Sequence, residues 1–162
     1  MPLIRESTAY QGLDGLDRAI LRALQEDGRL TNVDLARRVG LSPSPCLRRV
    51  KSLEERGYIQ GYAATLDPEL LGRALQVVVM VRLADQRQET LAAFEAAVAR
   101  IDDVMRCSLI AGDADYLLTV QVSDLDSYHA LYTQKLGELP GVSSLRSLVT
   151  MKAVKDTRAL PV

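Results

Sequence analysis

The stretch from Thr31 to Arg56 constrains the fold more than any other part of the chain, because it predicts two short helices joined by a tight turn. Thr31 is placed to cap the first helix, and Asp34 completes a capping-box pattern. Gly40 ends that helix, since glycine adopts a left-handed C-terminal conformation without steric cost. Ser42 is expected to cap the second helix, with Pro43 in its first turn. This order indicates a helix-turn-helix.

The second helix has one apolar side and one polar side. At about 100° per residue, Cys46, Leu47, Val50 and Leu53 form the side expected to be buried. The opposite side carries polar and basic residues, and arginine and serine there suit a helix that reads base edges and phosphates in the major groove. An ordinary amphipathic helix with a solvated basic face would explain the arginines but not the capped turn before them. The candidate DNA-binding residues are Thr31, Asn32, Arg37, Arg38, Ser42, Ser44, Pro45, Arg48, Arg49, Lys51 and Ser52.

The charge is unevenly distributed along the 162 residues, although the net charge is only −1. Residues 1–66 carry 10 basic and 8 acidic side chains, for a net charge of +2, and residues 67–162 carry 10 and 13, for a net charge of −3. This asymmetry indicates that the first half approaches phosphates, so double-stranded DNA is the expected partner. The 48% of hydrophobic residues excludes a disordered chain.

Other classes of protein find little support in the sequence. Cys46 and Cys107 have no metal-ligand spacing and indicate reduced cysteines in a cytosolic protein. Met1 to Tyr10 lacks the apolar core of a signal peptide, and no apolar run is long enough to span a membrane. His129 is the only histidine, so a metal site is not expected, and no phosphate-binding loop or catalytic constellation indicates a cofactor or an enzyme.

Three further segments complete the expected N-terminal half. Residues 1–12 are predicted to be a flexible polar arm, and a support helix is predicted from Leu16 to Glu26 with Asp14 as its cap. The apolar residues around Gly61, within 58–66, suggest a short hairpin that would form a wing. The winged helix-turn-helix domain is therefore expected at 13–66, and Asp67-Pro68 and Gly72 mark a hinge at 67–74.

The second half, at 75–155, is predicted to alternate strands and helices. Its segments are a strand at Leu75–Leu83, a helix at Thr90–Ile101, strands at Val104–Ala111 and Tyr116–Val122, a helix from a Ser123–Asp126 capping box to Leu136, and a strand at Val142–Val154. This βαββαβ order is the ferredoxin-like arrangement, which makes the chain an α+β protein. Helices cover one face of such a sheet. The other face would carry either Val77, Val79 and Val81 or Val78, Met80 and Arg82, and a second subunit is its simplest cover.

From Leu13 to Val154 the chain resembles the Lrp/AsnC family of transcription regulators, also called feast/famine regulators. The resemblance rests on residues 27–50 (DGRLTNVDLARRVGLSPSPCLRRV), residues 55–62 (ERGYIQGY), residues 111–118 (AGDADYLL) and residues 139–142 (LPGV). The SPSPC start of the second helix is similar to the leucine-responsive branch. The resemblance implies homodimers that assemble further, commonly into tetramers of dimers. It also implies that an amino acid binds where dimers meet and shifts assembly or DNA affinity.

The resemblance places the expected effector site around the turn after residue 111. Its residues are Leu109, Gly112, Asp113, Asp115, Tyr116, Leu148, Val149 and Thr150. A carboxylate such as that of Asp115 can accept an ammonium group, and the N–H groups beside Gly112 can bind a carboxylate. Many leucine-responsive relatives carry a tyrosine where this chain has Leu148. The alternative is that Gly112 and Asp113 only form a β-turn.

These observations predict a cytoplasmic, nucleoid-associated DNA-binding transcription regulator that responds to an amino acid. The alternative is an architectural protein that bends or wraps DNA without an effector. An enzyme built on the ferredoxin-like half would rest on analogy of fold alone.

Overall fold

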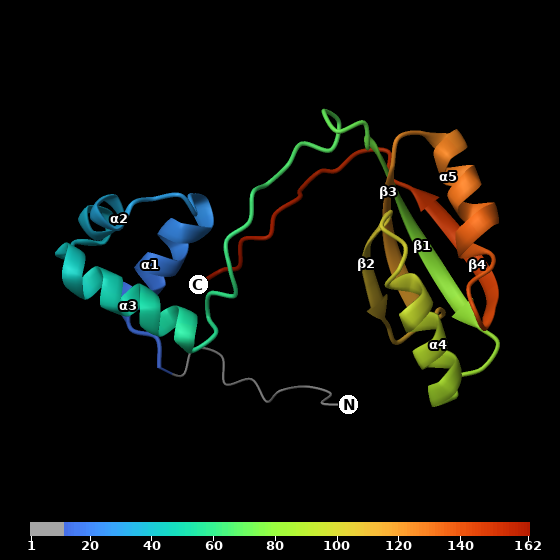
Figure 1. Cartoon of the computed structure of the whole chain (residues 1–162), viewed down its shortest axis with the longest axis horizontal. Helices are drawn as coiled ribbons and strands as arrows, with labels where there is room; N and C mark the ends of the chain where they lie inside the picture. The colour runs from blue at the N-terminus through green and yellow to red at the C-terminus, as the bar shows by residue number, and fades with distance from the viewer. Residues whose placement is uncertain (1–11) are drawn as a thin grey trace. The chain divides into compact units, whose positions relative to one another are not determined.

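The computed structural model describes residues 12–162 (Figure 1), so the predicted polar arm lies almost entirely outside the described residues. The contacts divide the chain into two units. The first contains the helices up to Thr65 together with the segment Asp156–Val162, and the second spans Leu66–Lys155. The segment Asp156–Val162 follows the predicted second domain in sequence but packs with the first, which the sequence did not indicate.

The first unit is a three-helix bundle. Its helices are α1 (Gly15–Glu26), α2 (Asn32–Val39) and α3 (Pro43–Glu55). The Asp14 side chain accepts a bond from the Asp17 N–H, and the Asp17 carboxylate accepts from the Asp14 N–H at 3.3 Å, which makes a capping box. This bonding, together with Arg49, lowers the pKa of the Asp14 carboxyl below its ordinary value. The core forms around side chains from all three helices that are at most 2% exposed: Ile20, Leu35, Ala36, Cys46 and Leu53.

The turn between α2 and α3 forms largely as expected. Gly40 has a φ of +74° and ends α2. The Thr31 side chain accepts from the Asp34 N–H, and its hydroxyl donates to the Asp34 carboxylate at 2.6 Å. Ser42 occupies the cap position of α3, but its side chain makes no capping bond, so that part of the prediction is wrong. Pro45 is the third residue of the helix and has no N–H, so one of the two usual donors to a capping side chain is missing.

The hairpin predicted at residues 58–66 does not form. The N–H groups of Tyr58 and Ile59 donate to the carbonyl of Leu53 and close the end of α3, and the following residues 60–66 contain no strand and are all exposed. A two-stranded hairpin is marginal in water unless a buried face stabilises it. This segment buries no side chain that could supply one.

The second unit has the predicted βαββαβ order. Its elements are β1 (Leu75–Leu83), α4 (Gln88–Val98), β2 (Val104–Leu109), β3 (Tyr116–Val122), α5 (Leu125–Leu131), a π-helical turn η1 (Tyr132–Leu136) and β4 (Val142–Val149). The strands form one antiparallel sheet in the order β2-β3-β1-β4 (Figure 1). The cap of α5 is Asp124, which accepts from the Ser127 N–H, rather than the predicted Ser123. Asp124 has the extended backbone of a cap residue, and the Ser123 hydroxyl bonds to the side chains of Asp124 and Ser127 instead.

The structure decides which face of β1 is buried. Val77, Val79 and Val81 are fully buried in a cluster that also contains Phe94 of α4 and Leu131 of α5, so both helices cover that face. The opposite face carries side chains that are only partly buried or exposed: Val78, Met80, Arg82, Leu117, Thr119 and Leu148. Val78 pairs with both Thr119 and Leu148 in neighbouring strands, so this open face is continuous across three strands.

Candidate DNA-binding and effector surfaces

Three side chains of α3 present a polar, basic surface to solvent. Ser44, Arg48 and Lys51 are all exposed, and they lie within two helical turns of one another on the side of α3 away from Cys46 and Leu53. Within the described part of the chain, Arg48 and Lys51 form no ion pair. Two uncompensated cations beside a hydroxyl are suited to phosphates and to the acceptor edge of guanine.

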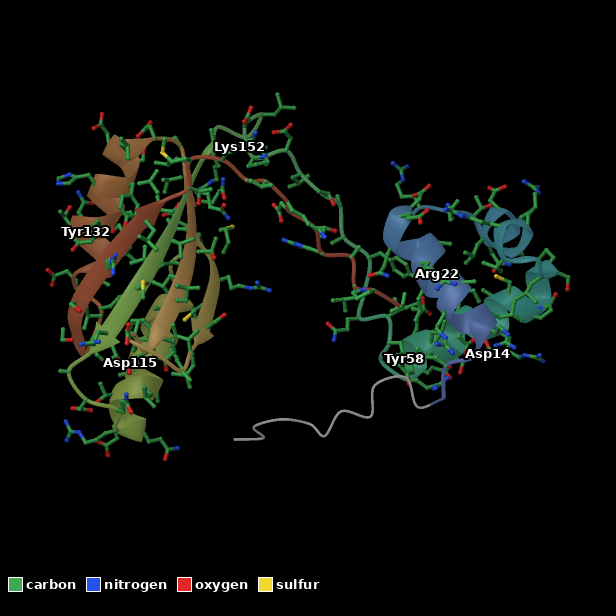
Figure 2. All side chains as sticks on the ribbon, turned by 180° about the vertical axis from the view of Figure 1, so that it is seen from behind. Asp14, Arg22, Tyr58, Asp115, Tyr132 and Lys152 are labelled. Carbon is green, nitrogen blue, oxygen red and sulfur yellow. The ribbon has the colours of Figure 1, made fainter. Side chains whose placement is uncertain are left out.

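Arg49 is directed instead into the helical bundle. Its Nη1 lies 2.7 Å from Oδ2 of Asp14 and 2.6 Å from Oδ1 of Asp17, so it ties α3 to the first turn of α1. The side chain of Asp17 is only 10% exposed, so its carboxylate is largely shielded from water. Arg49 is the charge partner of this carboxylate. Figure 2 labels Asp14 at this end of the bundle. Arg49 was expected on the DNA-binding surface, and this geometry gives it a structural role.

The other predicted DNA-binding residues divide into exposed and supporting positions. Arg38 pairs with Glu26, and Arg37 pairs with Asp34 at 2.9 Å while its side chain stays 75% exposed. A surface pair of that kind contributes little and is easily exchanged for a phosphate contact. Asn32 donates its side-chain N–H to the Pro43 carbonyl at 2.8 Å, which fixes the start of α2 against the start of α3. Thr31 and Ser42 lie exposed at the two helix starts, and Pro45 and Ser52 are half-buried.

Leu47 departs from the sequence expectation. It was assigned to the buried side of α3, but its side chain is 44% exposed, whereas Cys46 and Leu53 are 0% exposed. Because α1 and α2 cover only a narrow strip of α3, the apolar stripe read from the sequence was too wide.

The turn between β2 and β3 is held by groups that the sequence did not single out. The Asp115 carboxylate accepts from the Leu83 N–H at 2.7 Å and from the Gln86 side chain at 2.8 Å. Arg82 donates from Nε to the Asp113 carbonyl at 3.2 Å. Arg82 and Gln86 lie about 30 residues before the turn, and no local sequence signal connects them to it. Figure 2 labels Asp115 at this end of the sheet.

The predicted effector residues form two groups. Leu109, Gly112, Asp113, Asp115 and Tyr116 lie at the turn, and Tyr116 pairs with Val81. Val149 pairs with Val77, and the Thr150 N–H donates to the Gln76 carbonyl, so the second group lies beside a part of β1 that is four residues before Val81. That spacing separates the two groups by about 13 Å along the strands, and they also lie on opposite sides of β1.

A cavity of about 360 Å³ between α4 and β2 adjoins the first group and is bordered by Leu109 and Tyr116. Tyr116 itself is buried, and its hydroxyl donates to Glu95 at 2.6 Å. Burial and this bond to Glu95 raise the pKa of the Tyr116 hydroxyl above its ordinary value, so it stays a protonated donor. Glu95 and Arg106 provide charges of both signs at the cavity wall.

Two family models match successive parts of the chain. Residues 13–60 match a winged helix-turn-helix DNA-binding model, and residues 76–160 match the Lrp/AsnC ligand binding domain. The chain belongs to the Lrp/AsnC family. The leucine-responsive regulatory protein of Escherichia coli strain K12 is 45% identical over 148 residues, which cover 91% of this chain and 90% of that protein. The relatives of this Lrp/AsnC protein are therefore transcription regulators rather than enzymes.

Solved structures of Lrp/AsnC proteins have the same fold. A transcriptional regulator of Neisseria meningitidis in complex with L-Met has a TM-score of 0.88 at 40% identity, covering 92% of this chain and 96% of that one. An AsnC family regulator of Agrobacterium tumefaciens has a TM-score of 0.88 at 39% identity, covering 92% and 97%. A feast or famine regulatory protein of M. tuberculosis complexed with L-methionine has a TM-score of 0.79 at 33% identity, covering 91% and 98%. Among residues 12–162, no helix is long and apolar enough to cross a membrane.

Proposed function

We propose that this Lrp/AsnC protein is a sequence-specific transcription regulator that reads DNA with α3 and is controlled by an amino acid. The DNA-binding part of the proposal rests on one observation. The side chains of Ser44, Arg48 and Lys51 are exposed on α3, and ion pairs to α1 hold this helix in place. Base edges in the major groove require a helix that is both exposed and fixed in orientation. The bonds from Arg49 to Asp14 and Asp17 supply that fixed orientation.

The open face of the sheet supports a homodimer as the working unit. It is lined by Val78, Met80, Leu117 and Leu148, and a second copy placed face to face would remove these apolar side chains from water. Two α3 helices related by a two-fold axis would then read the two halves of a pseudo-palindromic site in the cytoplasm. Further assembly of dimers, up to a tetramer of dimers on nucleoid DNA, would add avidity on arrays of such sites.

The two separated groups of effector residues support an amino-acid site that is completed between copies. A single amino acid is too short to contact both groups across about 13 Å in one chain. Residues at the turn of one copy and residues 148–150 of another could enclose it together. Two similar regulators have been solved with L-methionine bound, so an amino acid with a flexible apolar side chain is the first effector to test.

The experiment is a gel shift and footprint on the DNA upstream of the protein's own gene, repeated with each amino acid. We expect a phased footprint that one amino acid changes, with a coupling of about 1–3 kcal/mol. The effector variant is Asp115→Asn, which should keep the footprint without amino acid and lose the response. Asp102→Asn, at an exposed acid after α4, is the matched control.

The outcomes separate the two parts of the proposal. No specific footprint would reject the DNA-reading role of α3. A footprint that no amino acid changes would reject control by an amino-acid effector and would favour an architectural DNA-binding protein. An Asp115→Asn variant that responds like the unchanged protein would remove Asp115 from the effector site.

A further inference from the structure

Leu47 is an apolar side chain on the solvent-facing side of a reading helix. It is 44% exposed, and its direction on the helix explains why. At about 100° per residue, Leu47 is turned by roughly 100° from Cys46 and roughly 120° from Leu53, the two fully buried residues of α3. Because Leu47 is turned so far from the direction of Cys46 and Leu53, a small rotation of α3 about its axis would not bury it.

The surroundings of Leu47 are polar and positively charged. Ser44 lies three residues before it and Lys51 four residues after it, so both are its neighbours on the helix surface. Arg48 follows it directly, and neither cation has an acidic partner within residues 12–162. An apolar protein surface docked on Leu47 would bury two uncompensated cations, which is costly. DNA would instead neutralise them with phosphates or guanine acceptors while Leu47 enters the groove.

The base edges of the major groove offer one apolar group, the C5-methyl group of thymine. We propose that Leu47 contacts a thymine methyl group and so confers a preference for thymine at one position of each half-site. This inference rests on the proposed function, because it requires α3 to lie in the major groove. It adds a specificity determinant that acts without a hydrogen bond, next to the polar contacts available to Ser44, Arg48 and Lys51.

The test removes the thymine methyl group from the DNA, the leucine side chain from the protein, and then both together. It compares the losses of binding affinity. In the footprinted site, each dT is replaced singly by dU, which lacks only the methyl group. For the unchanged full-length protein, we expect one position per half-site at which dU raises Kd by roughly three- to fivefold, the effect of one lost buried methyl contact. For Leu47→Ala, we expect a similar loss on the dT site and no further loss with dU at that position.

Two variants separate contact from folding. Leu47→Met keeps an apolar side chain of similar reach and should keep the sensitivity to dU. Leu125→Ala shortens another exposed leucine, 61% exposed at the start of α5, and should bind both DNAs like the unchanged protein. Alanine is the strongest helix former, so Leu47→Ala should retain its circular dichroism spectrum and melting temperature.

The results distinguish this inference from the function on which it rests. Absence of any specific footprint overturns both. A specific footprint that no dT-to-dU change weakens overturns the role of Leu47 and leaves the proposed function intact. Equal sensitivity to dU in the unchanged protein and in Leu47→Ala also overturns it, because another group would then contact the methyl.

Discussion

At the residue scale, Arg48 and Arg49 are adjacent in sequence but differ in role. Arg48 is exposed, whereas Arg49 is the partner of the nearly buried Asp17. We expect Arg48→Ala to weaken specific DNA binding by roughly 1–3 kcal/mol and to leave stability unchanged. Arg49→Met should lower the stability of the helical unit by roughly 1–3 kcal/mol, because it leaves the nearly buried Asp17 carboxylate without its charge partner and with only the bond from the Asp14 N–H. Gel shifts and hydrogen exchange of α1 and α3 amides in the intact protein measure the two effects, and similar results for both variants would contradict this assignment.

At the element scale, the two helices of the helix-turn-helix are capped differently. Thr31 bonds to Asp34 at the start of α2, whereas the Ser42 side chain makes no capping bond at the start of α3, where Pro45 lacks an N–H. We therefore expect Thr31→Ala to reduce the unfolding free energy of the helical unit by about 1 kcal/mol. Ser42→Ala, its matched control, should change it by less than about 0.5 kcal/mol. Equal losses in hydrogen-exchange stability would show that the Ser42 hydroxyl caps α3 in solution.

At the scale of the whole molecule, the chain passes between its two units twice, after Thr65 and after Lys155. The returning segment bonds to α1: Gln25 donates to the Leu160 carbonyl at 3.0 Å and accepts from the Leu160 N–H at 2.6 Å, and Arg22 donates to the Val162 carbonyl at 2.8 Å. We expect Gln25→Ala to speed tryptic cleavage after Arg158 several-fold, because cleavage requires the segment to detach. Mass spectrometry of the released peptide measures the rate. Gln60→Ala, at an exposed glutamine of the same unit, is the control, and equal rates in both variants would mean that Gln25 does not hold the segment.

Local sequence signals determined the order and type of the helices and strands in this protein, except for the hairpin predicted at 58–66, which does not form. Gly40, the Asp14 and Thr31 caps and the almost continuous apolar run of Leu75–Leu83 act over a few residues, so each could be read directly from the chain. The basic stretch on α3 was also read from local residues, whereas the turn after β2 was expected to be an effector site only from the resemblance to the Lrp/AsnC family.

Only the tertiary structure decided which side of an element is covered and which charges are paired. The direction of Arg49 depends on Asp14 and Asp17, more than 30 residues away, and the exposure of Leu47 depends on how narrowly α1 and α2 cover α3. The packing of Asp156–Val162 on α1 joins residues about 135 positions apart. Periodicity determines which residues share a face, but burial depends on the neighbour that the fold brings to that face, and this neighbour comes from elsewhere in the chain.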